Sequence, residues 1–272
     1  MAAPKSRTLG HWRIESGIDI FDIWTEAEPG TLHCHATYNF GCVLAGEARL
    51  DMGGESYEQP TDSVVLLNAY EAHASTWLAE ENRYFVVYVG EGAWAELILR
   101  VGIPASTRFS QPIVHDNILL FALKGLWSEL HSRPHTVTLD DIANLLRMTV
   151  GRGKTETGNI VAGAQPPAIL QNLSSQNTLQ AEGALRVEDV AAALGMTRFQ
   201  LSRLCQASHG MQPRRLKLQL MVAQAQVEIS RGASLTEAAL LAGFSDQSHM
   251  TREFRKTIGM TPREYQAVLP QN

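Results

Sequence analysis

The chain has 272 residues, of which 44% are hydrophobic and 19% charged, and its formal net charge is −5. This length and composition indicate a globular protein that exceeds one ordinary domain, so we expect two domains. No apolar run reaches the roughly 18 residues that span a bilayer, and the first residues lack the apolar block of a signal peptide. We therefore expect a cytoplasmic protein without a membrane partner. The three cysteines form no CxxC pair, which argues against a disulfide scaffold or a zinc finger.

Charge is divided unevenly along the chain. Residues 168–272 hold 11 Lys or Arg and 8 Asp or Glu, a balance of +3, and the remaining 12 basic and 20 acidic residues leave −8 for residues 1–167. A slightly basic tail beside an acidic body is expected if only the tail meets a polyanion.

Short runs typical of β-strands dominate residues 17–89. They alternate apolar with polar residues, are rich in β-branched and aromatic side chains, and are separated by Gly or Asn. The runs are GIDIFDIW, YNFGCVLAG, EARLDMGG, SVVLLN, HASTWL and RYFVVYVG. This pattern predicts an antiparallel sandwich or barrel.

Three amphipathic helices are predicted next, over residues 91–102, 115–133 and 138–152, because apolar residues recur there at three- and four-residue spacing. The second helix carries one apolar stripe, formed by Leu119, Ala122, Leu123, Leu126 and Leu130. The stripe either covers the barrel or contributes to a dimer interface, and we expect a homodimer. Residues 151–168 contain four Gly and two Pro without periodicity, which predicts a flexible linker.

The segment 185–216 recurs as the segment 233–265. Gly195 matches Gly243 at an offset of 48, and later positions match at an offset of 49, so one residue is inserted in the turn. The later matches are Arg203, Gly210, Met211 and Pro213 with Arg252, Gly259, Met260 and Pro262. The chain therefore contains one structural unit twice.

Each copy has the pattern of a helix-turn-helix. A helix with small apolar residues is followed by Gly, which permits a left-handed corner, and then by Thr197 or Ser245, whose hydroxyl is predicted to cap the next helix. The second helix of each copy has a continuous polar face that suits phosphates and base edges. A plain helical hairpin repeat is the alternative, but an interior hairpin would not expose such a face.

A long helix is predicted between the copies, over residues 213–231, because this segment starts with Pro and contains no breaker. It would be a rod of roughly 28 Å. Such a rod would place the two recognition helices about one turn of DNA apart, near 34 Å, on one face of the duplex.

The C-terminal residues 169–272 resemble the AraC/XylS transcription regulators. The matching tail motif comprises Gly243-Phe244, Phe254-Arg255-Lys256, Gly259, Pro262 and Tyr265. The resemblance implies promoter DNA and RNA polymerase as partners, and it implies base contacts by Phe199, Ser202, Arg203, Gln247, Ser248, His249, Thr251 and Arg252. Lys256, near the end of its helix, is expected to contact a phosphate. Cys205 and Gln219 stand where the family usually has Phe and Arg, so we expect the first module to pack or seat differently.

The front of the chain resembles the cupin-like sensing domain that many of these regulators carry. His33, His35, Asn39 and Gly46 follow the spacing of the first cupin motif, and His73 lies where the second motif supplies a histidine. Two histidines at i and i+2 of a strand point to the same side, so with His73 they can form a facial metal triad. However, Asn39 stands where metal cupins place Glu, and Asn is a poor metal ligand.

We therefore expect an organic-ligand pocket without a metal or cofactor. Its expected residues are His33, His35, Tyr38, Asn39, His73 and Trp77. Trp24 and Tyr84 also lie on predicted strands, where each ring suits the core as well as a pocket. The alternative is a metal-dependent cupin enzyme fused to a DNA-binding tail. A purely architectural DNA binder is a third class, which the sensing domain and the small charge of the tail disfavour.

These observations predict an α+β chain of two domains. Residues 1–150 form a cupin-like antiparallel barrel with appended helices, residues 151–168 the linker, and residues 169–272 an all-α domain with two helix-turn-helix motifs. The predicted function is that of a non-enzymatic, sequence-specific transcription regulator whose barrel senses a small-molecule effector. We expect the effector to alter how the two modules engage DNA, with the coupling transmitted through the linker.

Overall fold

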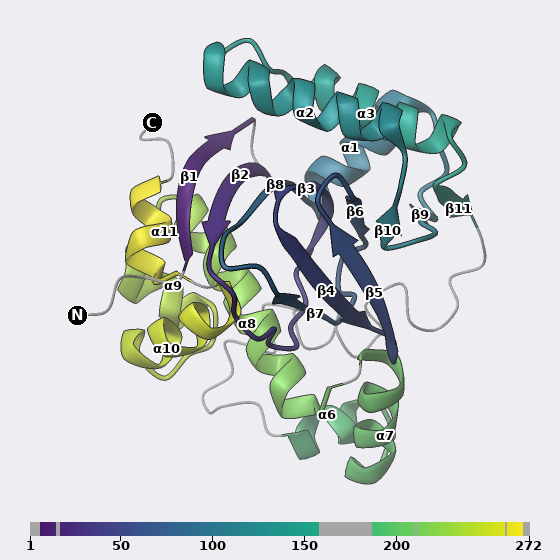
Figure 1. Ribbon diagram of the computed structural model, residues 1–272. Coiled ribbons are helices and arrows are strands. Elements are labelled where there is room, and N and C mark those ends of the chain that lie inside the picture. The colour runs from purple at the N-terminus through teal and green to yellow at the C-terminus, as the bar shows by residue number, and fades with distance from the viewer. Residues whose placement is uncertain (1–5, 15–16, 158–186, 210, 259, 269–272) are drawn as a thin grey trace.

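The computed structural model describes residues 6–14, 17–157, 187–209, 211–258 and 260–268 (Figure 1). These residues form an N-terminal lobe of β-sheets and helices and a C-terminal lobe of helices. In Figure 1 the helices of the N-terminal lobe lie on one side of the sheets, and the C-terminal helices lie on another.

The described residues form a large, a medium and a small antiparallel sheet. The six-stranded sheet has the order β1 (Ser6–Arg13), β2 (Ile18–Thr25), β8 (Asn82–Gly90), β3 (Thr37–Ala45), β6 (Val64–Leu67) and β10 (Ile113–Val114). The three-stranded sheet has the order β5 (Glu55–Pro60), β4 (Glu47–Met52) and β7 (His73–Trp77). The small sheet pairs β11 (Thr155–Thr157) with β9 (Thr107–Phe109). The predicted strand runs are all present, whereas β1, β5, β9, β10 and β11 were not predicted. The sequences of β1 and β5 mix polar and apolar residues without a clear period, and the other three strands are only two or three residues long.

Side chains along β3 point alternately to the two faces of the large sheet, and the two faces have different surroundings. Phe40 is fully buried against the layer formed by α1 (Glu91–Val101), α2 (Asn117–Ser132) and α3 (Leu139–Gly151). Asn39 and Gly41 lie on the opposite face, which borders an internal cavity. Burial of a large apolar side chain such as Phe40 contributes about 1.5–3 kcal/mol, so the helix layer fixes which face of the sheet is core.

The apolar stripe of α2 packs on the sheet. Leu119, Leu123 and Leu130 are buried in the core, and the other two stripe residues pack partly against it. The stripe therefore covers the sheet. Ile118 and Phe121 point away from this core and are 51% and 80% exposed.

The predicted two-domain α+β organisation is confirmed, but the N-terminal sheets are open in the described residues and do not close into a barrel. Residues 26–36, which run between the two larger sheets, pair with β7 only through the isolated bridges Glu28 with Trp77 and His33 with His73. Pro29 lacks an N–H group, so a continuous ladder cannot form there. At Gly30 a Cβ atom would lie 2.8 Å from the carbonyl carbon of Ser75, so only glycine allows this close approach.

The C-terminal lobe contains both predicted helix-turn-helix units. Its helices are α6 (Val187–Ala193), α7 (Arg198–His209), α8 (Pro213–Ser230), α9 (Leu235–Leu241), α10 (Gln247–Ile258) and α11 (Pro262–Val268). Gly195 and Gly243 have φ angles of 63° and 82°, so both take the left-handed conformation expected at the corner of each unit. The predicted connecting helix is α8, with Pro213 at its first turn.

The two recognition helices are capped at equivalent positions. Thr197 caps α7, because the amide of Gln200 donates to its hydroxyl at 3.2 Å while the Gln200 side chain accepts from the Thr197 amide at 2.8 Å. In α10 the cap is Asp246, whose Oδ1 accepts from the amide of His249 at 2.8 Å, and not Ser245 as predicted. Asp246 matches Thr197 at the offset of 49, so the inserted residue of the second turn lies before the cap.

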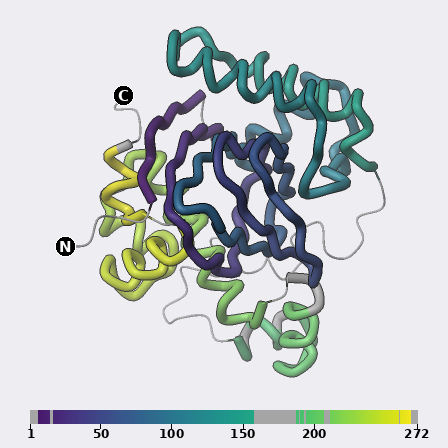
Figure 2. Tube along the Cα trace, viewed as in Figure 1, coloured from purple at the N-terminus to yellow at the C-terminus, as the bar shows by residue number. Residues whose placement is uncertain are grey.

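The C-terminal helices lie against the sheets of the N-terminal lobe (Figure 2), and the two lobes share buried clusters. Phe21 and Val86 of the large sheet are buried together with residues of α8, α9, α10 and α11. Cys34 is buried in a second cluster with residues of α6, α7 and α8. Within the predicted linker, residues 155–157 belong to β11 in the N-terminal lobe, and residues 158–168 lie outside the described residues.

Candidate functional site

A cavity of about 1210 Å³ lies between the lobes. One wall is formed by the sheets, with residues from β2, β3, β7 and β8, and the other by residues of α8, α10 and α11. From the C-terminal lobe, Gln224, Lys256 and Tyr265 border this space. A molecule in the cavity can therefore contact both lobes at once.

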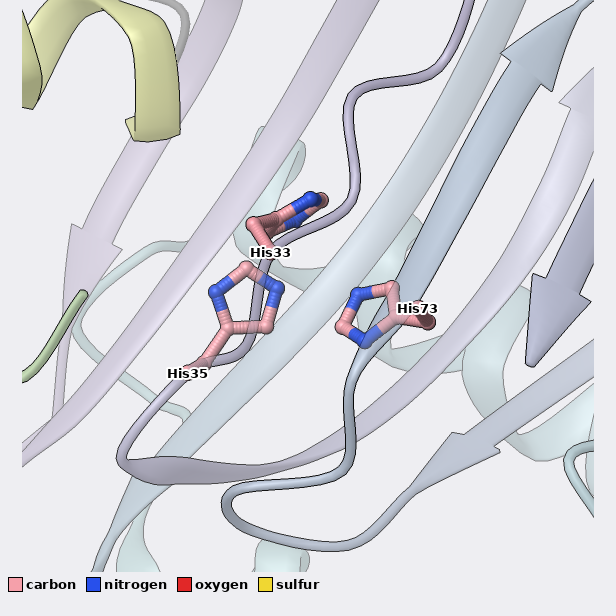
Figure 3. Close-up of side chains that lie close together, drawn as sticks. All are labelled: His33, His35 and His73. Carbon is pink, nitrogen blue, oxygen red and sulfur yellow. The ribbon is translucent and has the colours of Figure 1, made fainter. Parts of the chain in front are cut away.

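Three histidines meet on the sheet side of the cavity (Figure 3). His33 and His73 exchange two backbone hydrogen bonds, with N–O distances of 2.9 and 2.8 Å, which place their side chains next to each other. The ring centroids lie 4.5 Å apart for His33 and His73, 4.7 Å for His33 and His35, and 4.9 Å for His35 and His73. The structure thus brings together the three histidines that the cupin-like spacing predicted as neighbours.

Two of these rings have a defined tautomer. Nδ1 of His33 lies 2.7 Å from the carbonyl oxygen of Thr31, and Nδ1 of His73 lies 2.8 Å from that of Glu71. A carbonyl oxygen only accepts, so each Nδ1 carries the hydrogen and Nε2 keeps its lone pair.

The cluster is uncharged at neutral pH. Burial lowers the pKa of His73 to about 3, with a further lowering from His33. Burial also lowers the pKa of His35 and that of His33, because a charged imidazole loses its hydration in this site. Neutral imidazole is the form that binds metals and accepts hydrogen bonds.

The other predicted pocket residues divide between cavity and core. Asn39 lines the cavity, and its Oδ1 accepts a hydrogen bond from the Thr37 hydroxyl at 2.9 Å. Trp77 also lines it and stacks on Tyr84 at 4.8 Å. Tyr38 lies on the other face of β3, where its ring stacks on Trp94 at 3.9 Å in the core, so it does not border the cavity.

Trp24 likewise lies away from the cavity lining, and the guanidinium of Arg7 covers its ring at 4.7 Å. Four aromatic residues that line the cavity were missed: Phe21, Tyr70, Phe85 and Tyr88. Tyr88 lines it, with its ring 5.3 Å from that of His35. Its spacing from Tyr84 on the same strand already placed the two rings on one face.

The recognition helix α7 presents two of its three predicted base-reading residues to solvent. Phe199 is 69% exposed and Arg203 is exposed, with the guanidinium carbon 5.9 Å from the centre of the Phe199 ring. Ser202 is half-buried, and its hydroxyl donates to Gln212 at 2.6 Å.

The recognition helix α10 presents Gln247, Ser248 and Arg252 as exposed residues. His249 is half-buried, with Nδ1 3.2 Å from the Ser245 hydroxyl. Thr251 is also half-buried, and its hydroxyl donates to the carbonyl oxygen of Gln247 at 2.8 Å. The exposed part of this face is polar, as contact with base edges requires, and Gln247 Oε1 accepts from the Thr236 hydroxyl at 3.1 Å.

Lys256, at the end of α10, also borders the cavity, which the sequence did not predict. It is exposed, and its Nζ donates to Glu253 Oε1 at 2.8 Å. The end of α10 thus borders the cavity between the lobes.

The two departures from the family pattern are both buried packing residues. Cys205 is fully buried in the cluster shared by α6, α7 and α8. Gln219 of α8 is buried, and its Nε2 donates to the hydroxyl of Thr257 in α10 at 3.2 Å. Gln219 therefore links the connecting helix to the second recognition helix.

An open sheet lobe and two helix-turn-helix units with polar recognition helices, with a cavity between the lobes, define the class of effector-responsive DNA-binding proteins. The AraC-like ligand-binding domain family matches residues 28–146, and a helix-turn-helix domain family matches residues 190–267. The chain thus combines an AraC-like ligand-binding domain with a helix-turn-helix domain, as in an AraC family regulator. No helix in the described part of the chain has the length and hydropathy needed to cross a bilayer.

Solved structures share the fold. ToxT from Vibrio cholerae O395 is similar with a TM-score of 0.60 and 14% identity, covering 98% of this chain and 99% of that chain. ToxT from Vibrio cholerae strain SCE256, with a bound unsaturated fatty acid, has a TM-score of 0.59 and 15% identity, covering 93% and 95%.

A curated relative matches over a shorter stretch. The bifunctional transcriptional activator/DNA repair enzyme Ada of Escherichia coli (strain K12) is 31% identical over 87 residues, which are 32% of this chain and 25% of Ada. The chain thus spans about a quarter of the length of the curated relatives it matches.

Proposed function

We propose that this protein is a one-component transcription regulator in which a small molecule, bound in the cavity between the lobes, changes how the two helix-turn-helix units engage promoter DNA. The observation that carries the proposal is the shared wall of the cavity. His35 and Trp77 border it from the sheets, and Tyr265 and Lys256 border it from the helices that hold the second unit. A ligand that contacts both walls binds more tightly to the arrangement of the lobes that brings the walls together. It therefore shifts the equilibrium toward that arrangement.

The effector contacts in this proposal are His33, His35, His73, Asn39 and Trp77. The aromatic rings offer apolar area, while the imidazoles and the Asn39 amide offer polar partners, which suits an organic molecule with an apolar body and a polar end. The unsaturated fatty acid in one of the similar ToxT structures has this character. We propose no contact for Tyr38, because its ring is stacked in the core.

The DNA contacts in this proposal are the exposed faces of α7 and α10. Phe199, Arg203, Gln247, Ser248 and Arg252 are the primary base-reading residues because their side chains are exposed. Of these, Gln247 accepts a hydrogen bond at Oε1 from the Thr236 hydroxyl at 3.1 Å, which it exchanges for a base contact. Ser202, His249 and Thr251 contribute after a change of their present hydrogen bonds. Lys256 contacts a phosphate, and its position at the cavity couples that contact to the effector.

The regulator acts as a homodimer that contacts RNA polymerase, with sensing by residues 1–150 and DNA binding by residues 169–272, and it is not an enzyme. Exposed Ile118 and Phe121 on α2 support a protein contact at the helix layer.

The decisive experiment is a footprint of the full chain on the DNA beside its own gene, with and without small molecules. A metabolite panel is first screened by thermal shift. Hits are then compared on Trp77→Ala and on the matched control Trp24→Ala, whose ring lies outside the cavity lining. The proposal requires a hit that changes the footprint of the control but not that of Trp77→Ala. A response equal in the two variants would place the effector elsewhere.

A further inference from the structure

The three-histidine cluster has the features of a prepared metal site. His33 and His73 come from segments forty residues apart, and a pair of backbone hydrogen bonds holds them in register. His35 extends the same segment as His33, so its ring joins the pair from the side (Figure 3). The backbone therefore positions all three rings before any ligand arrives.

The hydrogen bonds of the rings are those of metal-binding histidines. Backbone carbonyls hold Nδ1–H of His33 and His73, which fixes the orientation of each ring and leaves Nε2 as the donor atom. Among the described residues the ring nitrogens of His35 make no hydrogen bond. The Nε2 lone pairs of His33 and His73 are therefore free to bind a cation.

The spacing of the donor atoms suits a transition metal. One nitrogen from each of the three residues lies within 4.8 Å of the others. A point equidistant from three such atoms is about 2.8 Å from each, whereas a zinc–imidazole bond is about 2.0–2.1 Å. Each ring would need to move by less than about 1 Å, which a small side-chain rotation provides.

We propose that His33, His35 and His73 bind a divalent transition-metal ion, with zinc as the best match, and that a fourth coordination position faces the cavity. Three imidazoles and one exchangeable oxygen ligand form a known kind of zinc site, so the missing carboxylate at Asn39 does not prevent binding. Hydroxide or an anionic oxygen of the effector supplies the charge that Asn39 lacks.

This inference deepens the proposed function, because the open position lies in the cavity proposed for the effector. An effector with a carboxylate or another oxygen donor then binds through the ion, while its apolar part meets Trp77 and Tyr84. Metal removal should abolish the response to such an effector, yet leave operator binding by the apo protein measurable. Metal binding itself is tested without DNA, so the two ideas can fail separately.

The test uses the full chain, purified without an affinity tag, stripped with a chelator, and titrated with Co(II) and then with Zn(II). We expect saturation at one equivalent, visible absorption typical of low-coordinate Co(II), and loss of that absorption on addition of Zn(II). His35→Ala and His73→Ala should weaken binding by more than about a hundredfold, since even outer partners of a metal site contribute ten- to a hundredfold. The matched control is His135→Ala, because His135 is exposed and outside the cluster.

Two results would overturn the proposal. One is a wild-type chain that takes up neither ion at one equivalent. The other is uptake by folded His35→Ala and His73→Ala equal to that of His135→Ala, which would reveal adventitious surface binding. If a variant does not fold, X-ray absorption of the wild-type zinc form decides instead, because the site requires three imidazole ligands and any smaller number excludes it.

Discussion

Arg13 in β1 donates through Nη2 to the Ser230 hydroxyl at 2.9 Å, and Nη1 lies 3.4 Å from the carbonyl oxygen of the same residue. This contact joins the edge strand of the large sheet to the last residue of α8. The Tyr265 hydroxyl lies 3.2 Å from that of Ser230, so the contact also reaches α11. The lobes are thus connected by a directional hydrogen-bond network beside their shared apolar clusters.

Ser230→Ala tests this connection with little other damage, because Arg13 keeps its pairing with Asp19. Loss of the two hydrogen bonds of this hydroxyl, to Arg13 and to Tyr265, should lower the free energy of unfolding by about 1–3 kcal/mol. Hydrogen exchange should rise in β1 and at the end of α8 but stay unchanged in α1. Ser132→Ala, at the exposed end of α2, is the control. Unchanged exchange in β1 would mean that the apolar clusters alone hold the lobes together.

Asp19 should make the free energy of unfolding depend on pH in the acidic range. Burial by itself would raise the pKa of Asp19, but hydrogen bonds from His11 and Arg13 hold it below its ordinary value. A lowered carboxyl pKa contributes stability above about pH 4, and this contribution is lost as the pH falls through the folded value. Denaturant titrations at several pH values should show a shallower acid loss for Asp19→Asn. Parallel curves for the two proteins would contradict the role of this ion pair.

Arg203→Ala and Arg252→Ala should reduce sequence discrimination by about 1–3 kcal/mol at a few base pairs, because bidentate contacts to guanine carry information. Lys256→Ala should weaken binding to all sequences alike and reduce the salt dependence, as expected for a phosphate contact. Competition binding with operator and random DNA separates these outcomes. Equal losses on both kinds of DNA for the arginine variants would show that another face of the helix reads the bases.

The spacing of the two units should be visible on DNA. Because α8 is one continuous helix between them, the footprint of the full chain should consist of two halves one helical turn apart. Insertion of half a turn of DNA between the two halves should sharply reduce the affinity of the protein for the operator. An operator that tolerates the half-turn insertion would indicate that only one unit reads DNA.

The same substitution should have opposite effects at two glycines. Gly195 has a φ of 63°, so Gly195→Ala should cost about 1–2 kcal/mol through left-handed strain. Gly125 lies within α2 with open space where a Cβ would be, so Gly125→Ala should gain up to about 1 kcal/mol of helix propensity. Thermal unfolding of both variants measures the difference. A stabilising Gly195→Ala would show that the corner can take another conformation.

The sequence by itself determined the features that depend on neighbouring residues. The corner glycines, the Thr197 cap, the Pro213 start of α8 and the apolar stripe of α2 act within one or two turns of chain, so their spacing was sufficient to predict the C-terminal units and the helix layer. The second cap shows the limit of that reasoning. Ser245 and Asp246 are both good caps, and the position of the inserted residue decides between them.

Only the tertiary structure decided the features that join distant segments. Alternation shows that Tyr38 and Asn39 face opposite ways, but the packing of α1 on β3 decides that the tyrosine is core and the asparagine faces the cavity. The bridge between His33 and His73 depends on the path of residues 26–36 along β7, and Pro29 and Gly30 keep that path from becoming a strand that closes the barrel. The sequence did not predict that α8, α10 and α11 form a wall of the cavity. Apolar surfaces that pack together from distant segments share no common pattern in the sequence.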